Sequence, residues 1–383
     1  MSFEHYIRSG TKLLRCGYTT GTCAALAAAG AAELLLTGRA PAVVSLMTPK
    51  GWAVEVEPDF CLMEGDTARC AIRKDAGDDP DVTDGMLIRA EVTRTACGIE
   101  LDGGEGVGRV TKPGLDQPVG AAAINTVPRQ MIRAAAERVS AACGYSGGLR
   151  IRISAPGGEE IAKRTFNPRL GIVGGISILG SSGIVEPMSE RAIVETTALE
   201  IRQAASGGGK RLILLPGSYG MDYLTAMLPE LEPVPRAKCS NYIGEAIDAA
   251  RTEGFEELLL IGHIGKLVKL AGGIMNTHSK TADCRRELFV CHAALCGADT
   301  ATCRALMAEV SSEGCLAVLD RAGLRERVTE SLLGAIQEVL TRRAGDMRIG
   351  ALLFSGDMGM TGLTAGAKEL MDKWRKSEER ASP

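Results

Sequence analysis

Aromatic residues are scarce in this chain: only 4% of its 383 residues are Phe, Trp or Tyr. Proteins that hold single-stranded nucleic acid stack its bases on such rings, so their scarcity argues against that class. The formal net charge of −3 means that no overall basic field attracts a polyanionic strand either. Composition therefore gives no support for a nucleic-acid partner.

Long apolar runs and metal-binding cysteine pairs are also lacking. The longest apolar run, residues 23–36, is interrupted by Glu33 and falls short of the ~20 residues that cross a bilayer. The N-terminal stretch MSFEHYIRSGTK contains no continuous apolar segment of the kind found in a secretion signal. The twelve cysteines include no Cys-x-x-Cys pair, so no zinc or iron–sulfur site is indicated. We therefore expect a cytoplasmic protein with reduced thiols, no membrane contact and no metal site.

The length of the chain predicts two domains. Residues 1–168 show hairpin patterns and two helices without a crossover pattern, which predicts an α+β domain with antiparallel strands. One helix, within residues 13–36, is alanine-rich and is preceded by threonines that can cap it. The other begins near Pro128 and ends before Gly144. The three predicted hairpins pair residues 42–47 with 52–57, 69–73 with 86–95, and 149–154 with 160–164.

Residues 169–383 have a different pattern, in which short apolar strands alternate with helices. This alternation predicts a Rossmann-like, doubly wound parallel sheet with extra helices. The sequence leaves the role of the helical region 280–345 open. The predicted strands are residues 176–179, 212–215, 234–238, 258–261 and 349–354. Four of them end in a glycine-bearing loop, at Gly180, Gly217, Gly262 and Gly356.

Ligands of such sheets bind outside the carboxyl ends of the strands, so the glycine-bearing loops are candidate binding loops. The stretch LGIVGGISILGSSGIVEPMSE, residues 170–190, shows the layout best: a strand, a glycine turn and the start of a helix. Its spacing is Gly-x-x-Gly rather than the Gly-x-Gly-x-x-Gly of dinucleotide sites. The candidate ligand contacts are Gly180, Ser181, Ser182, Gly183, Gly217 and Gly262, with Asp222 for ribose hydroxyls.

Three features of the N-terminal half have both a functional and a structural interpretation. Arg15 with Thr19 and Thr20 forms either an anion site or an ordinary helix cap. The run at 103–108, followed by Arg109 and Lys112, is either a ligand loop or a wide turn. Residues 75–81 contain four Asp, which suggests a cation site or a solvated turn.

The four histidines differ in their surroundings. His5 lies near the N-terminus. His263 follows a predicted strand end, and His278 lies in an Asn-Thr-His-Ser stretch, so either could contact a substrate. His292 shares a predicted helix with Cys291 and Cys296, which favours a packed core position.

Several long motifs together resemble one family. They include LRCGYTTGTCAALAAAGAA, TPKGW, KDAGDDPDVTDG, DGGEGVGRVTKPGL, AINTVPRQMI, AKRTFNPRLGIVGGISILGSSGIVEPMSE, SNYIGEAIDAARTEG and GHIGKLVKLAGGIMNTHS. They are similar to the cobalt-precorrin-5B C1-methyltransferase family of anaerobic cobalamin biosynthesis, across roughly residues 13–300 by the extent of these motifs. The chain departs from the family pattern at Thr126, where Pro is expected, and at Ser181-Ser182, where Thr is expected. Neither departure removes a charge.

The resemblance implies a transferase that uses S-adenosylmethionine to methylate C1 of cobalt-precorrin-5B, giving cobalt-precorrin-6A. Cobalt enters only as part of this tetrapyrrole substrate. The resemblance also implies a fold unlike that of the better-known precorrin methyltransferases. Because the macrocycle carbon is itself nucleophilic, no covalent side-chain nucleophile is needed; His263 is the one candidate catalytic residue.

The acceptor carries many carboxylates, which Arg and Lys side chains recognise best. As a set these cations predict a basic cleft between the two domains, with 1–168 holding the tetrapyrrole and 169–383 the methyl donor. The candidate substrate contacts are Arg15, Thr19, Thr20, Gly104, Gly106, Lys112, Arg129, Arg164, Arg169 and Lys266.

Two other functions stay open at this point. One is a nucleotide-dependent oxidoreductase that uses the same kind of sheet, although the Gly-x-Gly-x-x-Gly spacing is missing. The other is a non-catalytic tetrapyrrole or cobalt carrier. The sequence also leaves open whether the chain forms a homo-oligomer.

Overall fold

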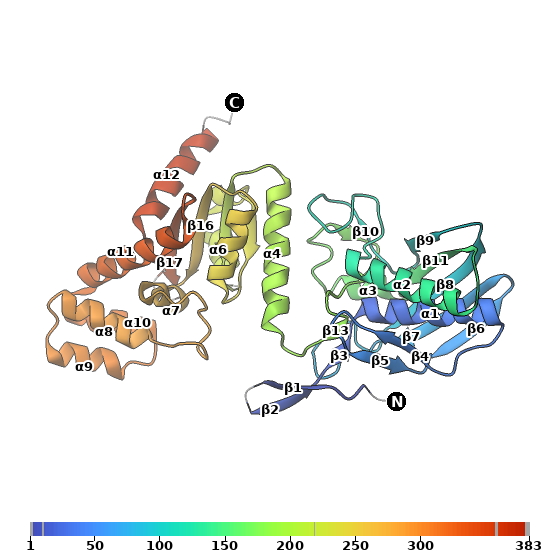
Figure 1. The fold of residues 1–383 in the computed structure, drawn as a ribbon. Helices are drawn as coiled ribbons and strands as arrows, with labels where there is room; N and C mark the ends of the chain where they lie inside the picture. Colours follow the sequence, from blue (N-terminus) through green and yellow to red (C-terminus); the bar gives the residue numbers. More distant parts are fainter. Residues whose placement is uncertain (1–2, 10, 218, 357–358, 380–383) are drawn as a thin grey trace. The chain divides into compact units, whose positions relative to one another are not determined.

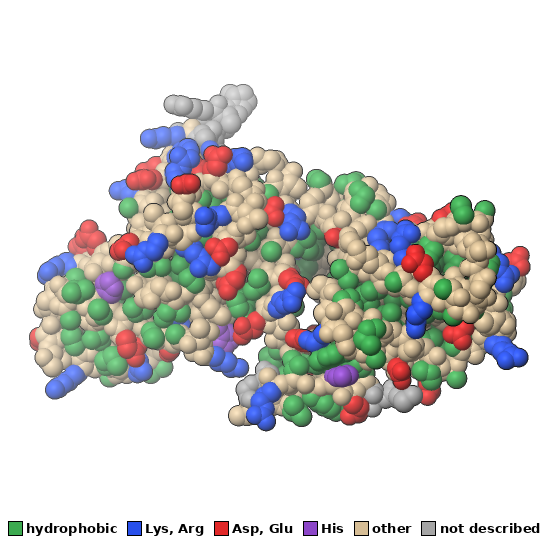
Figure 2. All heavy atoms as spheres, viewed as in Figure 1, with side chains coloured by type: hydrophobic (Ala, Val, Ile, Leu, Met, Phe, Trp, Pro, Cys, Tyr) green, Lys and Arg blue, Asp and Glu red, His purple; other side chains and the backbone are tan. Residues whose placement is uncertain are grey.

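The chain folds as a mixed α/β protein of two compact units, Met1–Ser189 and Glu190–Pro383 (Figure 1). The structure is a computed structural model that describes residues 3–9, 11–217, 219–356 and 359–379. The sequence placed the division at 168/169, whereas the segment 169–189 lies in the first unit. On the face drawn in Figure 2, cationic and acidic side chains are interspersed over both units, which agrees with the small net charge.

The first unit is built around a five-stranded sheet in the order β6-β7-β8-β11-β9. Its pairs are antiparallel except β9 with β11, which is parallel. The elements are β1 (Tyr6–Ser9), β2 (Lys12–Arg15), β3 (Gly17–Tyr18), α1 (Thr20–Thr37), β4 (Val44–Met47), β5 (Ala53–Val56), β6 (Phe60–Glu64), β7 (Thr67–Arg73), β8 (Leu87–Thr95), β9 (Ile99–Gly103), β10 (Arg109–Val110), α2 (Thr126–Ala142), β11 (Gly148–Ser154), α3 (Gly158–Ala162), β12 (Ile172–Val173) and β13 (Ile184–Val185).

Two of the three predicted hairpins are confirmed: β4 pairs with β5, and β7 pairs with β8, both antiparallel. The third is wrong, because residues 158–162 form the short helix α3 instead of a strand. Glu159 and Glu160 occupy the first turn of α3, where carboxylates are favoured by the helix dipole. β11 pairs with β8 and β9 instead.

Helix α1 lies at the centre of the first unit and packs against α2 and against strands β7 and β8. Thr19 caps its start by accepting from the Thr22 N–H, and Gly38 ends it in the left-handed region at φ 72°. By length and composition α1 could cross a membrane, but 83% of that window is buried inside the unit. It is therefore a core helix, and its alanines and glycines allow neighbouring elements to approach closely.

The second unit holds a five-stranded sheet in the order β15-β14-β16-β17-β18. The first four strands are parallel and the edge strand β18 is antiparallel. The elements are α4 (Glu190–Ser206), β14 (Arg211–Leu215), α5 (Tyr219–Met227), η1 (Pro229–Leu231), β15 (Arg236–Lys238), α6 (Ile243–Thr252), β16 (Glu257–His263), α7 (Ile264–Leu267), η2 (Val268–Gly272), α8 (Arg285–Leu295), α9 (Thr300–Ala308), α10 (Ser312–Arg321), α11 (Arg325–Ala344), β17 (Arg348–Ser355), β18 (Gly359–Leu363) and α12 (Ala365–Glu379).

Helices cover both faces of this sheet. Successive residues of a strand point to opposite faces, so alternate residues of β14 pack in two different cores. Leu212 and Leu214 pack in one core with α4, α6 and the helices α8 to α11, so the helical region 280–345 covers that face. Ile213 and Leu215 pack in a second core with α5 and α12.

One predicted strand belongs elsewhere. Residues 176–179 are not part of the second sheet; Ile176 and Ile178 form isolated parallel bridges to Val107 and Ile124 in the first unit. The prediction that Gly180 ends a strand of the second sheet is therefore wrong. Strand β18 was also missed, since its five residues, GMTGL, contain two glycines and no alternating pattern.

Glu257 joins the last helix to the start of β16. Its side chain is 3% exposed, and it accepts from the indole Nε1 of Trp374 at 2.5 Å and from Arg348 at 2.5 Å. Lys373 also pairs with it, and Arg211 lies 3.5 Å away. Burial alone would raise the pKa of Glu257, but the hydrogen bonds from Lys373 and Trp374 and the nearby cations outweigh it, so this pKa lies below its usual value.

We predict that Glu257→Gln lowers the free energy of unfolding of the second unit by about 2 kcal/mol at pH 7, because an amide cannot pair with the cations. Since the folded-state pKa is depressed, the stabilisation is complete above the ordinary Glu pKa of about 4.3 and is lost as pH falls through the folded value. The difference between wild type and variant should therefore shrink on acidification.

The measurement is urea unfolding at pH 7 and at acidic pH, followed by Trp374 fluorescence in a Trp52→Phe background. Glu256→Gln is the matched control, since Glu256 is 63% exposed and lies 3.9 Å from Lys210. Equal stability of the two variants at pH 7 would contradict the role of Glu257.

Candidate functional site

The carboxyl ends of β14, β15 and β16 lie at one edge of the second sheet, and Lys266 connects them. Its Nζ lies 3.5 Å from the Ser240 carbonyl oxygen, just beyond β15. A Cβ built on Gly217, just beyond β14, would lie 3.5 Å from the same Nζ. Lys266 itself follows β16 in helix α7. The residues after three parallel strands thus meet at one amine.

The Lys266 amine is half-buried, and no ion pair to it is found among the described residues. Burial lowers its pKa below the usual lysine value; the nearby Lys269 charge acts in the same direction and the Cys239 thiol opposes it. A partly desolvated cation without a carboxylate partner is suited to bind an anionic group.

The backbone around this amine has unusual conformations. Gly217 has φ 107°. Apart from its neighbours in the chain, the Lys266 amine is the one described group within 4 Å of a Cβ added there, so space remains beside Gly217. Ser240 has φ 52°, a left-handed value that is uncommon for a residue with a side chain.

Tyr219 is 74% exposed at the start of α5, and Asp222 lies exposed in its first turn.

Sequence reasoning did not select Ser240, Asn241 or Thr277 for this site. The Thr277 N–H donates to the Asn241 carbonyl at 2.9 Å, which brings residues 276–278 against the segment after β15. The available signal was the Asn-Thr-His-Ser stretch, from which only His278 was predicted as a possible substrate contact. The His278 Nδ1 accepts from the Lys280 N–H at 3.0 Å.

Two other predicted residues at this edge have structural partners. His263 caps α7: its Nδ1 accepts from the Gly265 N–H at 3.1 Å, and its Nε2 lies 3.1 Å from Glu313 Oε1. Both ring nitrogens are therefore engaged. Gly262 is buried, and a Cβ there would come within 2.8 Å of Pro216 Cγ, so close packing accounts for the glycine. A direct role in catalysis or ligand binding stays a prediction for both.

The loop of Gly180, Ser181, Ser182 and Gly183 lies on the start of α1, in the first unit. The Leu179 N–H donates to Thr20 Oγ1 at 3.0 Å, and Thr22 Oγ1 donates to the Gly183 carbonyl at 2.6 Å. Thr19 and Thr20 are 6% and 3% exposed. These threonines hold the loop in place.

Two predicted substrate contacts pair with, or donate to, other groups of the first unit. Arg15 pairs with Asp75 at 2.6 Å. The Arg129 guanidinium is half-buried and donates to the carbonyls of Ile124 and Ala122 at 2.7 and 3.2 Å. The acidic loop 75–81 is a turn held by such pairs, and no cluster that could hold a metal is found in the described part of the chain.

The glycines of the 103–108 loop are explained by packing. A Cβ on Gly104 would lie 2.4 Å from Ser154 Oγ, and one on Gly106 would lie 1.9 Å from the Ala155 carbonyl oxygen. Arg109 pairs with Asp102 at 2.8 Å. This loop therefore packs tightly against the segment that follows β11.

Three predicted substrate contacts lie in or beside the loop formed by residues 163–171. Lys112 packs against Gly171, and Arg164 and Arg169 flank Phe166. All three cations are exposed, and none makes an ion pair within the described ranges. Phe166 is 49% exposed, and the neighbouring Val173 in β12 is 59% exposed. We call Lys112, Arg164, Phe166, Arg169 and Val173 the cationic loop surface.

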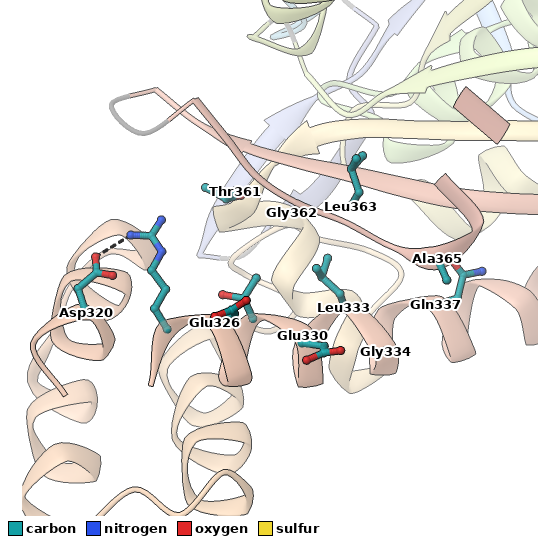
Figure 3. Close-up of a pocket in the computed structure, with 12 residues that line it drawn as sticks. Asp320, Glu326, Glu330, Leu333, Gly334, Gln337, Thr361, Gly362, Leu363 and Ala365 are labelled. Carbon is teal, nitrogen blue, oxygen red and sulfur yellow. Dashed lines mark hydrogen bonds and ion pairs between the residues drawn. The ribbon is translucent and has the colours of Figure 1, made fainter. Parts of the chain in front are cut away.

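A separate cavity of about 950 Å³ lies between α10, α11 and the edge strand β18 (Figure 3). Asp320 pairs with Arg325 at its margin at 2.6 Å, and Glu326 and Glu330 of α11 also line it. None of the residues predicted as site residues lines it. Its acidic lining is unsuited to an acceptor rich in carboxylates.

Comparisons with known proteins give consistent matches. The family model described as CbiD matches residues 7–187, and the one described as CbiD, C-terminal domain, matches residues 276–365. A cobalt-precorrin-5B C(1)-methyltransferase of Ruminiclostridium cellulolyticum is 47% identical over 353 residues, 92% of each chain. One from Alkaliphilus metalliredigens is 42% identical over 371 residues, 96% of this chain and 97% of its own.

A solved structure also matches. The crystal structure of a cobalamin biosynthesis protein (cbiD) from Archaeoglobus fulgidus shares 32% sequence identity, covers 74% of this chain and 87% of its own, and superposes with a TM-score of 0.40.

Proposed function

This chain belongs to the CbiD family and is a cobalt-precorrin-5B C(1)-methyltransferase of cobalamin biosynthesis, and we propose that S-adenosylmethionine is its methyl donor. The methylated product is then cobalt-precorrin-6A. The relatives are named as methyltransferases, so neither the oxidoreductase nor the non-catalytic carrier is retained.

The donor binds at the carboxyl edge of the second sheet. The observation that carries this proposal is the Lys266 amine, which lies within reach of the ends of three parallel strands without an ion-pair partner in the described chain. Lys266 pairs with the donor's carboxylate, Gly217 leaves room beside it, and Asp222 accepts from ribose hydroxyls. This use of the sheet corresponds to a Rossmann-like, doubly wound domain.

The acceptor binds on the first unit, at the cationic loop surface. Lys112, Arg164 and Arg169 offer charge to the carboxylates of the tetrapyrrole, and Phe166 and Val173 offer apolar area to its macrocycle. Two other predicted acceptor contacts in this unit, Arg15 and Arg129, bond to Asp75 and to backbone carbonyls, and we do not assign them to this surface.

S-adenosylmethionine, when bound, supplies a methyl group activated by a sulfonium. The residues of this chain then act by positioning, since an in-line displacement onto a nucleophilic carbon needs no covalent nucleophile from the protein. Alignment of two reactants can contribute about 7–11 kcal/mol to rate acceleration. We place the reaction in the cytoplasm, without nucleic-acid or membrane partners.

Lys266→Met tests the donor site. We predict that this change raises the Kd of S-adenosylhomocysteine, measured by isothermal titration calorimetry, by roughly 10- to 100-fold, because a charged hydrogen bond is lost. The pKa of Lys266 lies below its usual value. As pH rises, the wild-type protein should therefore lose affinity before pH reaches the usual lysine pKa of about 10.4, because the amine loses its charge earlier. The affinity of the variant should not show this fall.

Lys280→Met is the matched control, since Lys280 is exposed beyond the 276–278 segment. It should bind as wild type does. Unchanged affinity in Lys266→Met would contradict the placement of the donor carboxylate.

The combined change Lys112→Ala, Arg164→Ala and Arg169→Ala tests the acceptor surface and the reaction together. Under anaerobic conditions with methyl-labelled donor, the wild-type product should gain one labelled methyl group by mass analysis. We predict that the triple variant raises the KM for cobalt-precorrin-5B at least tenfold, by loss of charge pairing, and leaves the Kd of S-adenosylhomocysteine unchanged.

The control removes three exposed, paired cations of the same unit: Arg73→Ala, Arg150→Ala and Lys163→Ala. It has the same net charge as the test variant. An equal rise of KM in both variants would show a general charge effect and would refute a specific surface. Absence of labelled product with wild type would refute the proposed donor.

A further inference from the structure

Two cysteines of the first unit lie directly opposite each other in the β6–β7 hairpin. The ladder pairs Cys61 with Cys70, and it closes at Glu64 and Thr67 around a two-residue turn. The closing pair of such a turn is hydrogen-bonded, and hydrogen-bonded and non-hydrogen-bonded pairs alternate along the ladder. Cys61 and Cys70, three pairs further on, therefore form a non-hydrogen-bonded pair.

This position suits a disulfide. The Cα atoms of a non-hydrogen-bonded pair are about 4.5 Å apart, inside the range of roughly 4.4–6.8 Å that a disulfide spans. In no other described ladder do two cysteines face each other as partners. None of the twelve cysteines forms a disulfide in the structure.

The surroundings bring the two sulfurs together under helix α1. The Cys61 thiol donates to the Gly30 carbonyl at 3.5 Å, and Cys70 lies opposite Cys61 in the ladder. A Cβ on Gly30 would lie only 2.7 Å from Cys70 Sγ, so the absence of a side chain on Gly30 makes room for this sulfur. Both thiols are thus held at the same small space between the hairpin and α1.

The two thiols differ in accessibility, and this difference sets their order of reaction. Cys61 is half-buried, whereas Cys70 is fully buried. The interaction with Cys70 holds the pKa of Cys61 below its usual value, and the same interaction, followed by burial, raises the pKa of Cys70. A partly exposed thiol beside a second, buried thiol is the usual arrangement of an attacking and a resolving cysteine.

We propose that Cys61 and Cys70 form a reversible dithiol–disulfide pair, with a low-molecular-weight disulfide such as oxidised glutathione as the oxidant. The Cys61 thiolate attacks one sulfur of the oxidant, whose S–S bond breaks and releases one thiol. The Cys70 sulfur, as it loses its proton, then attacks the Cys61 sulfur of the mixed disulfide and releases the second thiol. The protein loses two hydrogens, and its two electrons reduce the oxidant to two thiols.

The test exposes the full-length reduced protein to oxidised glutathione under anaerobic conditions. Free thiols are then alkylated in acid-quenched, denatured samples, and the linked peptides are mapped by mass spectrometry. We expect a mass loss of two hydrogens in a bridge between Cys61 and Cys70, at least tenfold more occupied than any other pair. Dithiothreitol should restore both thiols.

Cys61→Ser and Cys70→Ser should each abolish the bridge, and the matched control Cys143→Ser, at an exposed cysteine, should leave it intact. If Cys70→Ser fails to fold, Cys61→Ser alone decides, because it removes the more accessible sulfur. Two outcomes would overturn the proposal: Cys61 stays as a mixed disulfide with glutathione, or both thiols stay alkylatable after the exposed cysteines have reacted.

Discussion

The shared direction of β14, β15, β16 and β17 is the constraint on which the second unit's function depends. Because these strands run parallel, the segments that follow them come to one edge of the sheet. There the Lys266 amine lies within 3.5 Å of the Ser240 carbonyl oxygen, and beside Gly217. An antiparallel arrangement of the same strands would send alternate segments to opposite edges, and no single cation could lie near all of them.

Hydrogen bonds to buried threonines hold the Gly-x-x-Gly loop, residues 180–183, in the first unit. Thr20 accepts from the Leu179 N–H, and Thr22 donates to the Gly183 carbonyl, so the whole 177–183 segment is held at the start of α1. Both hydroxyls are buried, where an unmade hydrogen bond is costly. The Gly-x-x-Gly loop is therefore part of the unit that carries the cationic loop surface, and the sheet edge around Lys266 is a separate structure.

Local patterns in the sequence predicted local structure well. The cap at Thr19 and the two confirmed hairpins of the first unit, β4–β5 and β7–β8, follow from turn and capping chemistry that neighbouring residues determine. The apolar run 176–179 has the pattern of a buried strand, but a pattern does not name its partner. Its bridges to Val107 and Ile124 span more than fifty residues of sequence, so local reasoning assigned it to the wrong sheet.

The candidate site could be predicted only in part, because a local pattern does not show which distant segments meet. Gly217 was selected because it follows a predicted strand, and Lys266 was selected as a cation for the carboxylates of the acceptor. Their meeting with Ser240 depends on the order of strands in the sheet, which spacing does not reveal. Of the cations chosen for the acceptor, only the structure separates Arg15, which is paired with Asp75, from exposed ones such as Arg169. Hydrogen–deuterium exchange with S-adenosylhomocysteine tests the donor site most directly. We predict protection in the segments that follow β14, β15 and β16, with none at residues 180–183; protection confined to residues 180–183 would contradict the assignment.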